Sequence, residues 1–440
     1  MFRRFSISLL VLSTVSGVAD AKKLEVPDEH ATIQSAIASA QPNDTIEIEA
    51  GTYLGSIYVP ASKAGLRIVG KGKVILDFGS NGTLGGGLRI AADDVEVKNL
   101  TVRLARDGAS GDAEGVNIEG DRARVEKLTA YSNDWHGLRI AGDDAHVKDS
   151  KFAAGQFGVG IYGDDAVIED CTASGAVGTG FYVWGDRAVI RDNVSRNCSE
   201  GASILGDDGL IDDCRSENGA YGFHIEGDNG RIRSSKVAGW SSYGIQINGQ
   251  NPLVKGNELE RCSSDTKGIF VRGCTFGKIE ENEITDSLGP AIHVDGNGVR
   301  CKENEIRRCG YATTDVDEHY AAFAVTGNGN ELIDNVVRDC PATAIYVEGN
   351  GNLLTGNALK KNRNDGIHIA SGVGNRLVDN SVRKSVAEGI QNWGAATDLL
   401  GNELKNNRLD IANDGSISEF EGNEYETGGP QTPTQVDPPA

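Results

Sequence analysis

The chain has 440 residues and a formal net charge of −21, with 58 glycines, few aromatic residues and a single methionine. The negative charge argues against nucleic acid or an anionic membrane as the main partner, and the composition favours many short strands with tight turns over a helical bundle. Length alone would suggest two or three domains, but an internal repeat overrides that expectation.

The first residues have the pattern of an export signal. Two arginines precede a short apolar run over Ile7–Leu12, and a small-x-small cleavage site ends at Ala21. The apolar run is too short to cross a bilayer, and no membrane span is expected elsewhere. We therefore predict a signal peptide over 1–21 and a secreted, periplasmic or cell-surface protein.

The mature chain opens with a helix pattern followed by strand patterns. Apolar residues recur at helical spacing over Ala31–Ala40, which predicts a short helix that caps the first coil of a solenoid. Alternation over Asp44–Tyr53 predicts a strand ending in a Gly turn. Three further short strands, at Ile57–Val59, Leu66–Val69 and Val74–Leu76, are expected to form the first, irregular coils.

From Gly87 to Trp393 one phrase is repeated about fourteen times, mostly at steps of 21 to 24 residues. Each copy reads Gly, an apolar residue, any residue, then Ile or Val, and a turn and a second apolar pair follow. Three short strands per repeat can wind into a parallel β-helix in which each coil hydrogen-bonds to the next. We predict an all-β, single-stranded parallel β-helix over 22–425, a monomer, with a disordered Pro-rich tail over 426–440.

Two polar residue types recur at the turns of the repeat. Aspartates mark the first turn, at Asp143, Asp144, Asp164, Asp165, Asp186, Asp207, Asp208 and Asp228. Asparagines mark the second turn, at Asn257, Asn282, Asn304, Asn335, Asn357, Asn380 and Asn402. Both types tolerate left-handed turns and can bond neighbouring backbone groups, so we interpret them as structural ladders. Calcium at the Asp turns is the alternative, and it is not predicted because the calcium-binding Gly-Gly-x-Gly-x-Asp repeat is absent.

Cys309 and Cys340 occupy equivalent positions in successive coils. Stacked strands lie roughly 4.8 Å apart, which is within the range of a disulfide. We predict a disulfide between these two cysteines and expect most of the others to be small buried apolar residues. No metal ligand is assigned, and the cofactor stays unknown.

Two insertions, at 105–114 and 311–320, interrupt the repeat just before the first strand of a coil. Insertions of this kind map to loops on one face of a solenoid, often the binding face. Both are therefore expected to overhang the sheet that the first strands form.

The repeat, together with Thr32-Ile-Gln-Ser-Ala-Ile and Gly51-Thr-Tyr, resembles the right-handed parallel β-helix superfamily, the pectate-lyase-like fold, over about 25–425. That resemblance implies a right-handed rod, and the superfamily includes polysaccharide lyases, polygalacturonases, pectin esterases, alginate epimerases and phage tailspikes. The Asp-Pro-His-Asp motif of alginate epimerases has only a partial counterpart in Asn133-Asp134-Trp135-His136, and the polygalacturonase motifs are missing as a set. Chondroitinase-like lyases use residue types that recur here at Lys267, Arg272, Glu226 and Asn248, without a matching linear motif.

Function is expected where side chains leave the rod along the first sheet. Aromatic faces there can stack on sugars, while polar groups bond sugar hydroxyls and the glycine column lets a ligand approach the backbone. The expected substrate-binding residues are His136, Arg139, Tyr162, Tyr182, Trp184, His224, Glu226, Gln246, Asn248, Asp295, Tyr346 and, on the second insertion, His319.

Three residues are predicted to carry catalysis. Arg272 would neutralise a uronate carboxylate, and Lys267 or His293 would remove the C5 proton. Glu226 and Asp295 are three coils apart, too far for a retaining glycosidase pair. We predict a carbohydrate-active protein, a polysaccharide lyase or C5-epimerase acting on an acidic glycan; the alternative is a non-catalytic glycan-binding or structural cell-surface β-helix protein.

Overall fold

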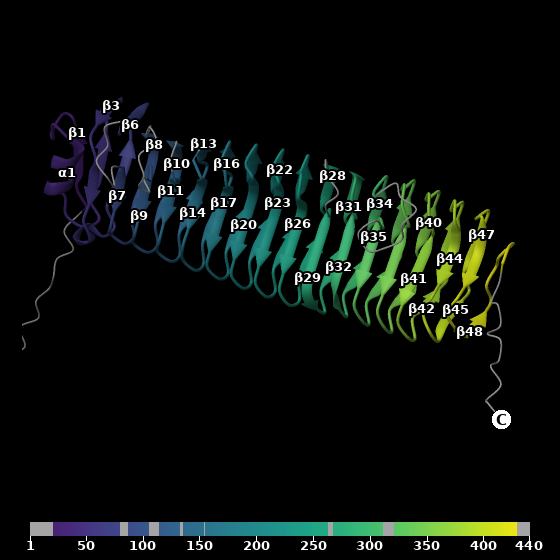
Figure 1. Ribbon diagram of the computed structural model, residues 1–440. Coiled ribbons are helices and arrows are strands. Elements are labelled where there is room, and N and C mark those ends of the chain that lie inside the picture. The colour runs from purple at the N-terminus through teal and green to yellow at the C-terminus, as the bar shows by residue number, and fades with distance from the viewer. Residues whose placement is uncertain are drawn as a thin grey trace, which may run out of the picture.

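The protein is described by a computed structural model that places residues 21–79, 87–104, 114–132, 135–153, 155–262, 267–310 and 321–428. The chain winds into one elongated rod of stacked coils, with the N-terminal elements at one end and the C-terminal elements at the other (Figure 1). The predicted signal peptide, except Ala21, and the predicted tail beyond Gly428 lie outside the described residues, as does the second insertion. In the ranges just given, no helix is long and apolar enough to span a membrane.

One face of the rod is a parallel sheet of 16 strands in chain order. Its strands are β4 (Ile57–Val59), β7 (Leu88–Ile90), β9 (Val116–Ile118), β11 (His136–Ile140), β14 (Phe157–Ile161), β17 (Thr179–Trp184), β20 (Glu200–Leu205), β23 (Tyr221–Glu226), β26 (Tyr243–Asn248), β29 (Ile269–Thr275), β32 (Ile292–Asn297), β35 (Phe323–Thr326), β38 (Ile345–Glu348), β41 (Ile367–Ser371), β44 (Glu388–Asn392) and β47 (Leu409–Asn413). We call it the first sheet, because each strand opens a coil of the repeat.

The rest of the wall consists of two further stacks of parallel strands. The second stack holds β1 (Lys23–Val26), β2 (Thr45–Ile48), β5 (Arg67–Gly70), β8 (Glu96–Leu104), β10 (Arg124–Ser132), β12 (His146–Lys148), β15 (Val167–Glu169), β18 (Val189–Arg191), β21 (Leu210–Asp212), β24 (Arg231–Arg233), β27 (Leu253–Lys255), β30 (Lys278–Glu280), β33 (Arg300–Lys302), β36 (Glu331–Ile333), β39 (Leu353–Thr355), β42 (Arg376–Val378), β45 (Thr397–Leu400) and β48 (Ile417–Glu421). The third holds β3 (Gly51–Leu54), β6 (Val74–Asp77), β13 (Lys151–Ala153), β16 (Thr172–Ser174), β19 (Val194–Arg196), β22 (Arg215–Glu217), β25 (Lys236–Ala238), β28 (Glu258–Cys262), β31 (Glu283–Ser287), β34 (Glu305–Arg307), β37 (Val336–Arg338), β40 (Ala358–Lys360), β43 (Ser381–Arg383) and β46 (Glu403–Lys405). The long strands β8 and β10 run through both stacks and join them into one sheet.

The helix α1 (Ile33–Ser39) lies at the N-terminal end of the rod (Figure 1). Thr32 caps it by accepting a hydrogen bond from the Ser35 backbone at 3.1 Å. Its apolar residues Ile33, Ala36 and Ile37 are buried against the first strands. The prediction of a short capping helix is therefore confirmed, and so are the strands of the first coils.

The interior of the rod is filled by columns of aliphatic side chains, one from each coil. Within the first sheet Ile225, Ile247, Val271 and Val294 follow one another in register, and each has no exposed surface. Burying one such side chain stabilises the fold by about 1.5–3 kcal/mol. The column repeats because every coil supplies the same apolar position, which is what the sequence period predicts.

Both predicted turn ladders are present. One Asp of each first turn accepts a hydrogen bond from the backbone of the next coil, for example Asp164 Oδ1 from Asp186 N at 2.9 Å; these residues are Asp143, Asp164, Asp186, Asp207 and Asp228. At the second turn each buried Asn accepts bonds from its neighbour: Asn304 Oδ1 accepts from Asn282 N at 3.1 Å and from Asn282 Nδ2 at 2.9 Å. The side chains thus satisfy backbone groups that the turns leave unpaired.

The predicted disulfide between Cys309 and Cys340 does not form, because both residues are free thiols. They do stack in adjacent coils, but as members of a turn ladder: the Cys309 backbone donates to Cys340 Sγ at 3.4 Å. The Cys309 thiol donates to the Arg307 carbonyl at 3.2 Å. Burial raises the pKa of the Cys340 thiol to about 12 and also raises the pKa of Cys309, so the thiolate needed for oxidation is disfavoured.

Candidate functional site

The outward face of the first sheet carries two columns of polar and aromatic side chains. In β26 alternation buries Ile245 and Ile247 and leaves Gln246 and Asn248 on the outside. The register then places Phe270 and His293 in the Gln246 column. Residues at the bend before each Gly also reach this face, since Tyr243 and Lys267 line a groove on it.

This groove, which we call the Lys267 groove, has a volume of about 470 Å³. It is lined by Tyr243, Lys267, Phe270, Arg272, His293, Asp295, Thr326 and Glu348. All three residues predicted for catalysis therefore meet in one cavity, together with the predicted binding residue Asp295. They come from β29, from β32 and from the bend before β29, so the coil register brings them together.

An aromatic stack forms the floor of the Lys267 groove. The ring of Tyr243 stacks on Phe270 at 5.6 Å, and Phe270 meets the His293 imidazole edge-on at 5.2 Å. The Lys267 ammonium lies 4.0 Å from the centre of the Phe270 ring. Because a cation is attracted to an aromatic face, this contact holds the ammonium over the ring.

Arg272 and Asp295 stand on the rim of the groove in adjacent coils. Arg272 Nε lies 3.8 Å from Asp295 Oδ2, and the two side chains are 66% and 53% exposed. An exposed ion pair of this kind contributes little to stability. The guanidinium is therefore accessible to an anionic group of a ligand.

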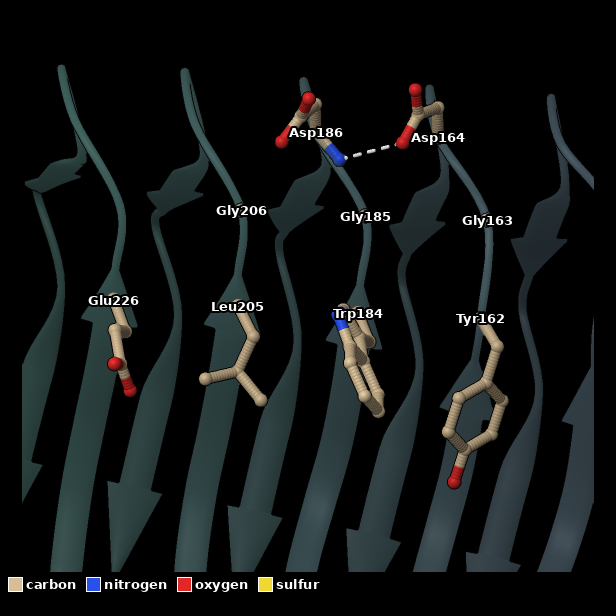
Figure 2. Close-up of a pocket in the computed structure, with 9 residues that line it drawn as sticks. All are labelled: Tyr162, Gly163, Asp164, Trp184, Gly185, Asp186, Leu205, Gly206 and Glu226. Carbon is tan, nitrogen blue, oxygen red and sulfur yellow. Dashed lines mark hydrogen bonds between the residues drawn. The ribbon is translucent and has the colours of Figure 1, made fainter.

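A second groove lies further toward the N-terminal end of the same face, and we call it the Trp184 groove. It has a volume of about 660 Å³ and is lined by Tyr162, Trp184, Leu205 and Glu226, with the turn residues Gly163, Asp164, Gly185, Asp186 and Gly206. Figure 2 shows the four larger side chains side by side on successive strands. Trp184 is 63% exposed, so its indole face is open to solvent.

Next to the Trp184 groove, His136 and Tyr162 form a hydrogen-bonded pair. His136 Nε2 lies 2.9 Å from the Tyr162 hydroxyl, and the imidazole stacks on Phe157 at 5.0 Å. Arg139 lies 5.0 Å above the Tyr162 ring. Burial lowers the pKa of His136 to about 3, and the charge of Arg139 adds to this effect. The imidazole is therefore neutral near neutral pH.

The remaining predicted binding residues that the structure describes contact neighbouring side chains on the same face. Tyr182 packs against Tyr162 at 5.8 Å between ring centres. His224 Nδ1 lies 3.5 Å from Ser203 Oγ and 3.6 Å from Glu200 Oε1. Gln246 donates to Asn248 Oδ1 at 3.2 Å. His319 lies outside the described residues.

Sequence reasoning missed a buried carboxylate–imidazole pair at the start of β41. Asp365 Oδ2 lies 3.0 Å from His368 Nδ1, and both side chains are almost fully buried. The imidazole is sandwiched between Tyr346, which stacks on it at 5.7 Å, and Trp393, whose ring centre lies 4.6 Å away. The available signal was an Asp at the bend followed three residues later by a His in an outward column.

No cluster of three or more His, Cys, Asp or Glu side chains that could hold a metal ion occurs among the residues described. Calcium at the Asp turns was not predicted, and those carboxylates act in the turn ladder.

The family model described as "Right handed beta helix region" matches three overlapping segments, 86–209, 114–250 and 200–323, which together cover more than half of the chain. The chain belongs to the right-handed β-helix family. A second model, "Periplasmic copper-binding protein (NosD)", matches 313–439. None of the curated proteins compared with this β-helix protein matches it.

Solved structures share the fold at low sequence identity. A PL6 alginate lyase in complex with a trisaccharide is 12% identical, with 74% of this chain and 87% of that chain covered and a TM-score of 0.53. An alginate lyase, AlyF-OU02, in complex with G6 is 12% identical, with 73% and 86% covered and a TM-score of 0.52. The periplasmic alginate epimerase AlgG is 14% identical, with 73% and 80% covered and a TM-score of 0.45. The likeness to the first two shows the right-handed β-helix fold predicted for this chain.

Proposed function

We propose that the protein is a secreted or periplasmic carbohydrate-active enzyme that removes the C5 proton of a uronate in the Lys267 groove, as a lyase or a C5-epimerase. The observation that carries this proposal is the convergence of Lys267, Arg272 and His293 in one cavity. Two cations in one groove of a chain with a net charge of −21 provide a local site for a carboxylate. The alginate lyases that share the fold act on a glycan of this class by their names.

The roles follow from the contacts of each side chain. Arg272 pairs with the uronate carboxylate, which stabilises the negative charge that develops when the C5–H bond breaks. Lys267 is held as an ammonium over Phe270, so it serves as a cation or acid. His293 takes the proton, because a neutral imidazole nitrogen can act as a general base and the ring lies in the groove.

Two outcomes are open to the carbanion. In β-elimination the C4–O bond breaks, a C4=C5 double bond forms, and the leaving oxygen receives a proton. In epimerisation a proton returns to C5 from the opposite face, and no bond of the chain breaks. Lys267 lines the groove and is the acid that we propose for either step.

The test is incubation with a panel of uronate polysaccharides. Elimination is read from the ultraviolet absorbance of the unsaturated product, and epimerisation from the exchange of C5 hydrogen with heavy water. We expect turnover on at least one polymer and a loss of at least about a hundredfold in His293→Gln. No turnover on any polymer would refute the enzyme proposal.

Matched controls come from the second stack of the same rod. Lys278→Met and Arg300→Met remove exposed cations from β30 and β33, far around the coil from the groove. They should retain full activity, whereas Lys267→Met and Arg272→Met should lose it. Equal losses in both pairs would assign the effect to net charge instead of to the groove.

A second candidate function is glycan binding without catalysis, and the Trp184 groove favours it. An exposed indole with Tyr162 on one side and Leu205 on the other offers a stacking face, and Glu226, two coils away in the same groove, offers a hydrogen-bond acceptor. Glycan-array binding that survives replacement of Lys267, Arg272 and His293 by Ala, and that is lost in Trp184→Ala, would support it. Loss of binding in the triple variant would contradict it.

A further inference from the structure

The side chains that line the Lys267 groove differ in charge between its two ends. Lys267 and Arg272 lie toward its N-terminal end, and Glu348 lies at its C-terminal end. The register Arg272, Asp295, Thr326, Glu348 separates the guanidinium and this carboxylate by three coils. At about 4.8 Å per coil this is roughly 14 Å, which is longer than one sugar ring. A glycan that fills the groove therefore meets both charges with different sugars.

Glu348 is held in place by a chain of contacts that begins in the buried pair described above. Its Oε2 accepts a hydrogen bond from the Tyr346 hydroxyl at 3.3 Å. The Tyr346 ring lies parallel to the His368 imidazole, with 2° between the planes. Asp365 fixes that imidazole through Nδ1, and its other oxygen accepts from the Glu388 backbone at 3.1 Å.

A positioned carboxylate at this end of the groove has a direct consequence for the ligand. It repels a second carboxylate and attracts hydroxyl or ammonium donors, and such repulsion is how sites discriminate between related ligands. The groove holds a second carboxylate, Asp295, but its charge is paired with Arg272. Glu348 is therefore the carboxylate that repels a ligand at the C-terminal end. A homopolymer of uronate would place like charges against Glu348.

We propose that Glu348 is a specificity-determining residue, and that the groove takes a glycan in which uronates alternate with uncharged or amino sugars. The uronate occupies the Arg272 end, and the sugar without a carboxylate occupies the Glu348 end. Tyr346, His368 and Asp365 are positioning residues for that carboxylate. The proposal rests on the proposed function for the uronate end of the groove.

The test compares the binding of two polymers by titration calorimetry, which does not need turnover. One is a polyuronate homopolymer, and the other is an alternating uronate–hexosamine polymer of similar length. We expect the wild-type protein to bind the alternating polymer at least about tenfold more tightly, which corresponds to about 1.4 kcal/mol. In Glu348→Gln this ratio should fall toward one, mainly because the homopolymer binds better.

Two further variants separate the carboxylate from general effects. Tyr346→Phe keeps the stack on His368 but removes the hydroxyl that orients Glu348, so it should give an intermediate ratio. Glu331→Gln neutralises an exposed carboxylate of the preceding coil, on β36, and should leave the ratio unchanged. Thermal unfolding of each variant confirms that it is folded.

The outcomes of this test distinguish failure of the selectivity proposal from failure of the enzyme proposal. Equal binding of both polymers by the wild type, or an unchanged ratio in Glu348→Gln, overturns the selectivity. Binding of neither polymer overturns it as well. A selective ratio with no unsaturated product and no C5 exchange upholds Glu348 as a selector and rejects the enzyme proposal alone.

Discussion

At position 160 the strand β14 approaches the ring of His136 too closely for any side chain. A methyl group added to Gly160 would lie 2.6 Å from His136 Cδ2 and 2.7 Å from Nε2. Gly160→Ala must therefore displace the imidazole and with it the Tyr162 hydroxyl. We expect a loss of about 1–3 kcal/mol in unfolding free energy, measured by urea denaturation. Gly51→Ala, where the nearest atom is 3.4 Å away, is the control and should be nearly neutral.

His136 also predicts how stability depends on pH. Its pKa is about 3 in the folded protein, because burial disfavours the charged ring, against about 6.5 in an unfolded chain. Below about pH 6.5 the His136 imidazole binds a proton in the unfolded chain but not in the folded protein. The contribution of His136 to the unfolding free energy is thus fully present above about pH 6.5, and it is lost progressively as the pH falls toward 3.

The measurement is the unfolding free energy of wild type and His136→Gln between about pH 6 and pH 4. The wild type should lose up to about 1.4 kcal/mol more per pH unit than the variant, which has no imidazole at this site. His30→Gln, which removes a partly exposed imidazole near the N-terminal end, should follow the wild type. Parallel curves for wild type and His136→Gln would contradict the assigned burial effect.

Among the elements, the Asn ladder combines several hydrogen bonds on each buried side chain. Asn304 accepts two bonds from Asn282 and donates to the Ile279 carbonyl at 2.8 Å and to Asn335 Oδ1 at 2.9 Å. Asn304→Ala leaves these buried groups without partners, and we expect a loss of about 2–4 kcal/mol. Asn423→Ala, at the partly exposed end of the ladder, should cost clearly less, as judged by urea denaturation. Equal losses would show that the ladder is not the cause.

The elements were predictable because each one repeats a local rule. The period, the apolar columns and the turn residues together specify a β-helix, and the capping helix at Ile33–Ser39 follows from helical spacing. The Cys309–Cys340 disulfide was wrong because register gives the distance between two residues but not the bonds that their thiols already make. Those bonds depend on the carbonyl groups around each thiol.

The candidate site was predictable to a smaller extent. Outward columns and register place Arg272, His293 and Asp295 together without any motif. Side-chain direction at the bend before each Gly is not given by alternation, so the sequence places Asp365 three residues before His368 but does not show that their side chains pair. The change from cations to the Glu348 carboxylate along the groove could not be predicted either. It depends on which side chains line one continuous groove, and this is set by side-chain conformations that the sequence does not give.

For the whole molecule, the net charge of −21 sets the approach of an acidic glycan. Long-range repulsion slows the encounter, and salt screens it beyond about 10 Å at 0.1 M ionic strength. The association rate with a uronate polymer should therefore rise with salt, measured by stopped-flow tryptophan fluorescence. A neutral glucan, as the control, should show no such trend. A rate that falls with salt would show that the local cations dominate the encounter.

The Asn ladder also gives the rod a direction. From Asn282 to Asn423 each side-chain Oδ1 accepts the backbone N–H of the ladder residue in the preceding coil. The amide dipoles of this row add along the axis, with the positive pole toward the C-terminal end. A cut that removes the last coils strands backbone N–H donors, which proteins rarely leave unpaired. A cut from the other side strands an Oδ1 acceptor and the Nδ2 donor that bonds a carbonyl of the lost coil, as Asn304 bonds Ile279. Although the rod is built from near-identical turns, it is therefore polar, and its two ends are chemically different.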